Sequence, residues 1–337
     1  MSPRRVPLNI FGIGFGMAGL ATTWRIAVGQ HLVVHEVSDV LIGLAAVAWL
    51  VSVVLYLHYL LTTRDALMTD LHDMTVGPFA SLALITPILL AADGIAPYAR
   101  SAAAVIVDVF VVGVVLLGGW FTGIWMRGGT NLDRLHPGYF LPTVAGGLVA
   151  SAGAAVVDQE RLAQFMLGVG IVYWFILGSM ILSRLMFRPP LPDALAPTLA
   201  IEIAPAAVAS VAYFLIHGAH VTPVLTALAG YGLLMVFAQI PLLSRYMRLT
   251  FSLATWAFTF PWAAVASTAL FWLAAEHVTG ARVLAYVVLT ALSVLVGAIA
   301  FRTIVAVIEG SLLPQTASII PPAVASCSTE PELAIKS

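Results

Sequence analysis

The chain of 337 residues is 61% hydrophobic and only 9% charged, with a formal net charge of −1. Soluble domains carry about a quarter charged residues, so a water-soluble fold is excluded and lipid must surround most of this chain. The near-neutral charge also excludes a basic surface for nucleic acid. The one cysteine, Cys327, excludes a disulfide framework and a cysteine metal site.

Ten apolar stretches are long enough to cross a bilayer, which takes about 20 helical residues. They cover residues 8–28, 37–60, 77–92, 101–124, 138–157, 162–183, 195–216, 221–243, 251–274 and 282–308. The predicted fold is therefore an all-α membrane protein with ten transmembrane helices, in one pore domain over residues 1–310. Residues 311–337 are rich in Ser, Pro and Glu and are predicted to be a disordered cytoplasmic tail.

The distribution of basic residues predicts the orientation, because Lys and Arg are retained on the cytoplasmic side. Eleven fall on one side of the ten helices: Arg4, Arg5, Arg64, Arg127, Arg134, Arg184, Arg188, Arg245, Arg248, Arg302 and Lys336. Four fall on the other side: Arg25, Arg100, Arg161 and Arg282. Both termini are predicted to be cytoplasmic, and the single lysine favours a bacterial source, hence the bacterial inner membrane.

Breakable helices alternate along the chain. A proline inside a helix frees the carbonyl four residues earlier, and interior prolines fall in the third, fifth, seventh and ninth helices: Pro87, Pro142, Pro205 and Pro261. The first helix has a glycine run that includes Gly14. This alternation predicts five helix hairpins, with an inner ring of odd-numbered helices lining a pore and an outer ring of even-numbered ones. Prolines are also common in membrane helices generally, which is the alternative explanation.

The side chains predicted to line the pore are weakly polar. They are Thr22, Ser81, Thr86, Thr143 and Thr259. No inward ring of charge is predicted of the kind a selective cation channel uses, whereas hydroxyls and helix dipoles replace part of an anion's hydration. The cytoplasmic arginines either concentrate anions at the inner mouth or serve as the topology signal alone.

Two phenylalanines precede the proline of the ninth helix. Phe258 and Phe260 are two residues apart, about 200° around a helix, so at most one of them points along a shared axis. A phenyl ring beside a kink is a candidate plug, since a hydrophobic constriction gates by dewetting or by a rotamer change. The alternative for either ring is lipid contact or core packing.

Three segments resemble one known family. They are PLNIFGIGFGMAGLATTWR at 7–25, PTLAIEIAP at 197–205 and WAFTFP at 256–261. They are similar to the tellurite-resistance/dicarboxylate transporter family, which includes TehA-type bacterial anion channels and plant guard-cell slow anion channels. The resemblance covers about residues 7 to 310 and implies a homotrimer in which each protomer has its own pore. It implies a gate at Phe260, with Phe258 as the fallback, and kinks at Gly14, Pro87, Pro142, Pro205 and Pro261.

The expected function is an anion channel or channel-like exporter that passes small anions, with chloride, nitrate, dicarboxylates and tellurite as the candidates, down their electrochemical gradient. The alternative is a proton-coupled carrier of malate-like C4-dicarboxylates that uses the intramembrane Glu202. Asp108, on an outer helix, is interpreted as a structural acid. The expected partners are small anions and the lipid bilayer.

The sequence contains two short patterns that resemble enzyme or metal-site motifs, and neither supports an enzyme. Gly14-x-Gly16-x-x-Gly19 matches a dinucleotide fingerprint but lies in an apolar helix without a preceding strand, where close helix packing explains it better. His217 and His220 supply two metal ligands without a third. We therefore expect no enzyme activity, no cofactor and no metal site.

Overall fold

A computed structural model describes residues 5–128, 131–218 and 220–313. Its described residues form helices and turns, with ten helices long and apolar enough to cross a membrane. These are Leu8–Gly29, His35–Thr62, Gly77–Ile95, Arg100–Met126, Pro137–Val156, Glu160–Phe187, Ala196–His217, Pro223–Tyr246, Leu253–Ala275 and Ala281–Ile308. The predicted all-α fold with ten spans is confirmed, with boundaries that differ by a few residues. The predicted disordered tail lies outside the described residues from residue 314 onward.

The even-numbered spans are mostly regular helices. Four of them are single elements: α2 (His35–Thr62), α5 (Arg100–Met126), α7 (Glu160–Phe187) and α12 (Ala281–Ile308). The eighth span is α9 (Pro223–Ala238), a 3-10 turn η8 (Ile240–Leu242) and α10 (Leu243–Tyr246). That break falls at Pro241, which cannot donate the helical backbone hydrogen bond.

The odd-numbered spans combine α-helix with 3-10 or π turns. The first is η1 (Leu8–Ile10) and α1 (Phe11–Gly29), and the third is η2 (Gly77–Ser81), α4 (Leu82–Leu90) and the π turn η3 (Ala91–Ile95). The fifth is η5 (Pro137–Phe140), the π turn η6 (Leu141–Ala145) and α6 (Gly146–Val156). The seventh is η7 (Ala196–Ile203) and α8 (Ala204–His217), and the ninth is η9 (Leu253–Phe258) and α11 (Thr259–Ala275).

Three of the four interior prolines lie in or beside such an irregular turn. Pro142 lies within η6, while Pro205 and Pro261 follow the junctions from 3-10 helix to α8 and α11. Pro87 lies inside α4, and the carbonyl that it frees, that of Ala83, accepts a hydrogen bond from the indole Nε1 of Trp49 at 3.0 Å. A side chain from a neighbouring helix thus satisfies the group that proline leaves open, as an apolar solvent requires.

Gly14 does not interrupt its helix. It lies within the continuous α1, and a Cβ added there would come within 2.9 Å of the Cβ of Trp49 on α2. The structure therefore gives Gly14 a packing role, since the missing side chain lets the two helices approach closely.

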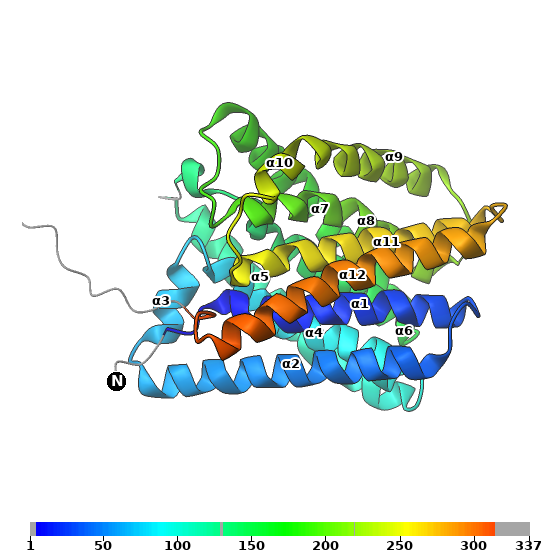
Figure 1. Cartoon of the computed structure of the whole chain (residues 1–337), viewed down its shortest axis with the longest axis horizontal. Helices are drawn as coiled ribbons and strands as arrows, with labels where there is room; N and C mark the ends of the chain where they lie inside the picture. The colour runs from blue at the N-terminus through cyan, green and yellow to red at the C-terminus, as the bar shows by residue number, and fades with distance from the viewer. Residues whose placement is uncertain (1–4, 129–130, 219, 314–337) are drawn as a thin grey trace, which may run out of the picture.

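Burial alternates along the chain. Between 44% and 83% of the apolar window is buried in the odd-numbered spans, against 11% to 33% in the even-numbered ones. Each odd span packs against the even span that follows it, and the odd spans also contact one another in a closed order: α1 with α4, α4 with α6, α6 with α8, α8 with α11, and α11 with α1. In Figure 1 the long helices run along one common direction, with α2 and α9 at opposite edges of the bundle.

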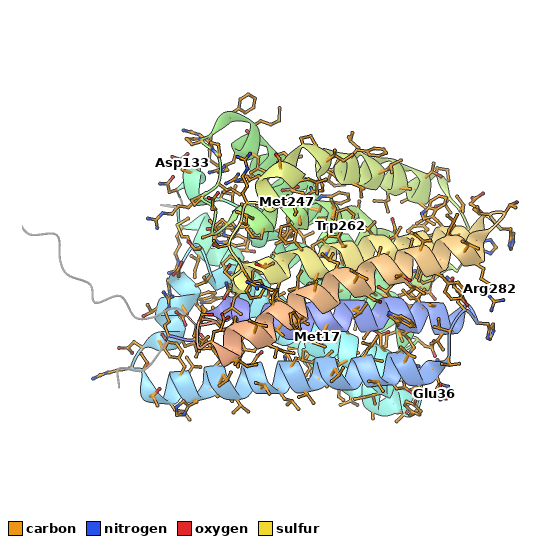
Figure 2. All side chains as sticks on the ribbon, viewed as in Figure 1. Met17, Glu36, Asp133, Met247, Trp262 and Arg282 are labelled. Atoms are coloured by element: carbon orange, nitrogen blue, oxygen red, sulfur yellow. The ribbon has the colours of Figure 1, made fainter. Side chains whose placement is uncertain are left out.

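Charged side chains mark the two ends of the bundle. Asp133 lies at the end that carries α3 (Ala66–His72) and α10, while Glu36 and Arg282 lie at the opposite end (Figure 2). At the first end Arg5 donates to Asp70 at 2.8 Å and to Asp73 at 3.2 Å, which attaches the N-terminal segment to α3 and the turn after it. The apolar middle and the charged ends match a hydrocarbon core between two aqueous surfaces.

Candidate functional site

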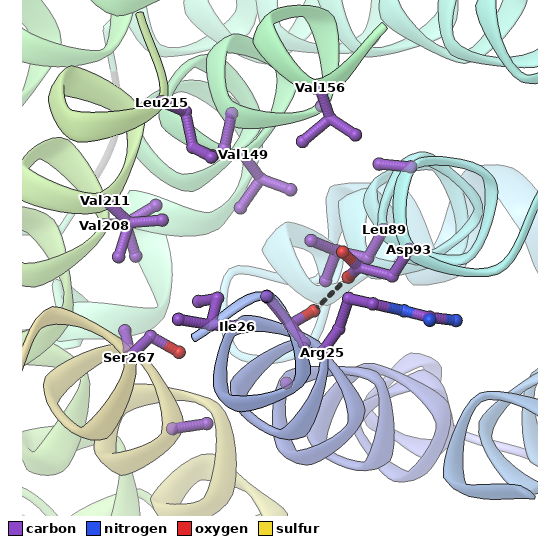
Figure 3. Close-up of a pocket in the computed structure, with 18 of the residues that line it drawn as sticks. Arg25, Ile26, Leu89, Asp93, Val149, Val156, Val208, Val211, Leu215 and Ser267 are labelled. Carbon is purple, nitrogen blue, oxygen red and sulfur yellow. Dashed lines mark hydrogen bonds between the residues drawn. The ribbon is translucent and has the colours of Figure 1, made fainter. Parts of the chain in front are cut away.

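A cavity of about 530 Å³ opens between the five buried spans. Its walls come from α1 (Thr22, Ile26), from α4 and η3 (Leu89, Asp93), from α6 (Val149, Val156), from α8 (Val208, Val211, Leu215) and from α11 (Phe260, Ser267). Figure 3 shows Val208 and Val211 on the opposite side of the open space from Asp93. The even-numbered spans contribute only Arg100, the first residue of α5. The cavity thus lies inside the closed order of odd spans.

One side of this cavity is polar. The hydroxyl of Thr22 on α1 donates to Oδ2 of Asp93 at 2.5 Å, and Arg25 also lines the space, with its guanidinium pointing away from Val208 and Val211 (Figure 3). Arg25 pairs with Asp39 of α2 at 2.5 Å, and Arg100 pairs with Asp158. The charges of both lining arginines are therefore balanced by carboxylates.

A second, much narrower space of about 40 Å³ follows along the same five spans. Its walls are aromatic and aliphatic, with Phe15, Phe79, Phe140 and Pro261 among them. Two residues, Val208 and Phe260, line both spaces. The wide and the narrow space therefore meet at Phe260.

Phe260 is held by a stacking contact. Its ring lies 3.8 Å from the ring of Phe15 on α1, centroid to centroid, with an interplanar angle of 21°. Only 9% of Phe260 is exposed, and Gly19 beside it admits the ring, because a Cβ there would come within 2.9 Å of Cδ2 of Phe260. Phe260 thus lies on both spaces, and its stacking partner Phe15 lies on the narrow one.

Comparison with known proteins decides the family. A family model described as SLAC1, voltage-dependent anion channel, matches residues 5–304. The chain belongs to this family. It is 26% identical over 309 residues to the tellurite resistance protein TehA homolog of Haemophilus influenzae, covering 91% of this chain and 93% of that relative. It is 27% identical over 314 residues to the S-type anion channel SLAH2 of Arabidopsis thaliana, covering 90% of this chain but 58% of that relative.

The family confirms the resemblance drawn from the three sequence segments. It also makes this chain a multi-pass membrane protein of an anion channel family rather than an enzyme. Within the described residues, no three His, Cys, Asp or Glu side chains lie close enough together to hold a metal ion.

The second phenylalanine of the family segment lies elsewhere. Phe258 packs edge-on against Tyr246 at the end of α10, with 4.8 Å between ring centroids, and lines neither of the two spaces. This difference between Phe258 and Phe260 agrees with their spacing of two residues, which lets only one of the two rings point inward.

Of the five hydroxyl residues predicted to line a pore, Thr22 lines the wide space. The other four, all described by the structure, are absent from both linings. Ser81, Thr86 and Thr259 donate to carbonyls of their own turns, at 2.7 to 2.8 Å. Thr143 faces Gly118 of α5. A hydroxyl that donates a hydrogen bond to a carbonyl of its own helix needs no other acceptor and can pack against a neighbouring helix.

The two intramembrane acids of the sequence analysis also lie away from the cavity. Glu202 is 5% exposed in η7 and lines neither space, and its Oε1 has no hydrogen-bond partner within the part of the chain that the structure describes. Asp108 is exposed on α5 and accepts a hydrogen bond from Gln159 at 3.1 Å.

The structure adds three residues that the sequence reasoning did not single out as site residues: Phe15, Asp93 and Arg100. Phe15 stands inside the glycine run of α1, which drew attention to the glycines alone. Asp93 and Arg100 stand at the ends of apolar stretches, where charged residues are expected for topology. Only the fold brings these two to one space.

Proposed function

We propose that this protein is an anion channel or channel-like exporter, with a pore along the axis of the five odd-numbered spans and a gate at Phe260. One observation carries the proposal: Phe260 lines both the wide and the narrow space and is stacked on Phe15 where they meet. A narrow apolar segment closed by aromatic rings excludes water and therefore ions, and a rotation of one side chain would reopen it.

The lining supports passage of anions by weak interactions. The cavity walls are mostly aliphatic, and the lining arginines are already paired with carboxylates, so no strong fixed charge would trap an anion inside. Conduction needs binding that is weak enough for release. The predicted excess of arginine on the cytoplasmic side would concentrate anions at that mouth and favour export.

The wider setting is proposed on the same grounds. We place the protein in the bacterial inner membrane with both termini cytoplasmic, as a homotrimer with one pore per protomer. The two relatives are named for tellurite resistance and for an S-type anion channel. Chloride and nitrate are therefore the first anions to test, followed by tellurite and dicarboxylates.

The gate is tested by chloride conductance of purified protein in planar bilayers. Phe260→Ala removes the ring where the two spaces meet and should raise chloride conductance at least tenfold above the wild type. Phe258→Ala is the matched control, because its ring packs on Tyr246, and it should leave conductance within twofold of the wild type. Equal conductance for the wild type and Phe260→Ala would reject the gate, and no anion conductance in either protein would reject the channel.

A further inference from the structure

The wide space contains one acidic side chain without an ion-pair partner. Asp93 belongs to the π turn η3 that ends the third span, and it lines the cavity. Its hydrogen-bond donor is the hydroxyl of Thr22, at 2.5 Å. No cation forms an ion pair with Asp93 in the described part of the chain. An acid on the wall of an anion pathway calls for an explanation, because its charge repels the permeant ion.

The charged groups around Asp93 come from each neighbouring element. From α1, Arg25 lies beside Asp93 but forms its ion pair with Asp39 of α2. Asp39 also accepts a hydrogen bond from Tyr98 at 2.8 Å. From the start of α5, Arg100 pairs with Asp158, which follows α6. Of the other titratable groups on these elements, His35 and Glu36 at the start of α2 pair with each other at 3.6 Å, and Asp108 lies on α5. Tyr56, His58 and Tyr59 lie near the other end of α2.

These pairs leave the cavity wall with an uncompensated negative charge when Asp93 is ionised. Two arginines face two partner carboxylates, and the carboxylate of Asp93 is additional. The opposite wall is formed by Val208, Val211 and Ser267 and offers no cation (Figure 3). One unit charge about 10 Å from a permeating ion, at an effective dielectric constant of about 20, changes its local concentration by about tenfold.

We propose that Asp93 and Thr22 form a proton-dependent anion site in the wide part of the pore, which holds a small monovalent anion when Asp93 is protonated and repels it when Asp93 is ionised. This inference rests on the proposed channel function. With Asp93 ionised, the Thr22 hydroxyl donates its hydrogen bond to the carboxylate and cannot donate it to an anion. With Asp93 protonated, its O–H and the Thr22 O–H become two donors that an anion accepts from.

The proton comes from the solution at this mouth and returns there, so anion flux needs no net proton transfer. The consequence is a pore whose conductance rises when the compartment at the Arg25 end becomes acidic. On the predicted topology this compartment is extracytoplasmic.

The test uses the Phe260→Ala protein, whose open gate exposes the effect of the wide space. Chloride conductance is recorded in planar bilayers while the pH of each chamber is varied separately between 5 and 8. Acidification of one chamber should raise conductance about tenfold, the effect of one removed charge. Adding Asp93→Asn should fix conductance near the acidic level at every pH, and Asp93→Glu should restore the pH dependence. Thr22→Val should lower the conductance at pH 5 severalfold and keep the pH dependence.

The matched control is Asp108→Asn, the same substitution on an acid that lies outside the cavity, and it should leave the pH profile unchanged. A pH profile that persists in Asp93→Asn, or an Asp93→Asn conductance fixed at the alkaline level, overturns the inference. Conductance of Phe260→Ala that is anion-selective but independent of pH overturns the inference and leaves the channel standing. Absence of any anion conductance in Phe260→Ala rejects the channel itself.

Discussion

The ring of Phe15 on α1 lies flat against the ring of Phe260 on α11, with 3.8 Å between their centroids. Both rings border the narrow space, and Phe260 also borders the wide one. The two helices are far apart in sequence and adjacent in the fold. In the proposed gate, the closed position of Phe260 would therefore depend on a partner ring from the first span.

Replacement of Phe15 should loosen the gate. An aromatic pair contributes about 0.5–1.5 kcal/mol beyond the apolar area that it buries, so Phe15→Ala should favour open conformations of Phe260 by a factor of about 2 to 10. Single-channel recording should show a higher open probability than in the wild type, and a lower one than in Phe260→Ala. Phe11→Ala is the control on the same helix, because Phe11 contacts Tyr56 and lines neither space. Equal effects at both positions would contradict a specific role for the pair.

The ten spans could be predicted from hydropathy, because a bilayer imposes one length and one composition on every span. Of the prolines predicted to kink their helices, Pro142 lies in a π turn and Pro205 and Pro261 lie just after 3-10 helix, whereas Pro87 lies inside the regular α4. Proline acts through its own backbone, so its effect is local and can be read from sequence.

The orientation of side chains could not be predicted in this way. Ser81, Thr86 and Thr259, predicted to line a pore, donate to carbonyls of their own turns and line neither of the two spaces. The 3-10 and π turns change the angular position of each following residue, so a helical wheel drawn at a constant angle fails beyond them. The Asp93–Thr22 contact joins residues 71 apart in sequence, and no local sequence pattern predicts it.

Close contact between α6 and α7 makes Gly147 sensitive to substitution. A Cβ added there would lie 2.7 Å from the backbone nitrogen of Gly170, a clash that only a shift of the helices can relieve. Gly147→Ala should lower the free energy of unfolding by about 1–3 kcal/mol, the usual cost of overpacking. Gly119→Ala on the exposed face of α5 meets nothing within 4 Å and should be neutral or slightly stabilising. Unfolding by SDS in mixed micelles measures both, and equal values for the two variants would refute the packing argument.

His136 should make stability depend on pH. It lies just before the fifth span, fully buried, and burial lowers its pKa to about 4, although the backbone carbonyls of Met74 and Thr75 partly oppose the shift. Its ordinary pKa is about 6.5, so between pH 6.5 and 4 the unfolded chain binds a proton that the folded protein does not. The free energy of unfolding should therefore have its full value above about pH 6.5 and should fall by about 3 kcal/mol on acidification to pH 4.

The His136→Asn variant isolates this contribution. An Asn side chain can accept the hydrogen bond that Nδ1 of His136 accepts from the backbone N–H of Gly138 at 3.1 Å, so the turn before η5 is kept. The difference in unfolding free energy between wild type and variant should shrink from pH 7 to pH 4.5. The same substitution at the exposed His58 should leave the pH dependence of the wild type intact. A difference that is constant over this range would show that His136 does not titrate with unfolding.

Glu202 distinguishes the channel from the proton-coupled dicarboxylate carrier. A carrier that uses Glu202 needs this carboxyl to meet both the proton and the substrate, yet it is buried in η7 and lines neither space, whereas Asp93 lines the wide one. Glu202→Gln keeps the shape of the side chain and removes its titration. We therefore expect chloride, nitrate and malate flux into proteoliposomes to be the same in Glu202→Gln and wild type, with no acidification of the lumen in either. Malate uptake that acidifies the lumen and is lost in Glu202→Gln would establish the carrier, because a channel that passes the anion alone moves no proton with it.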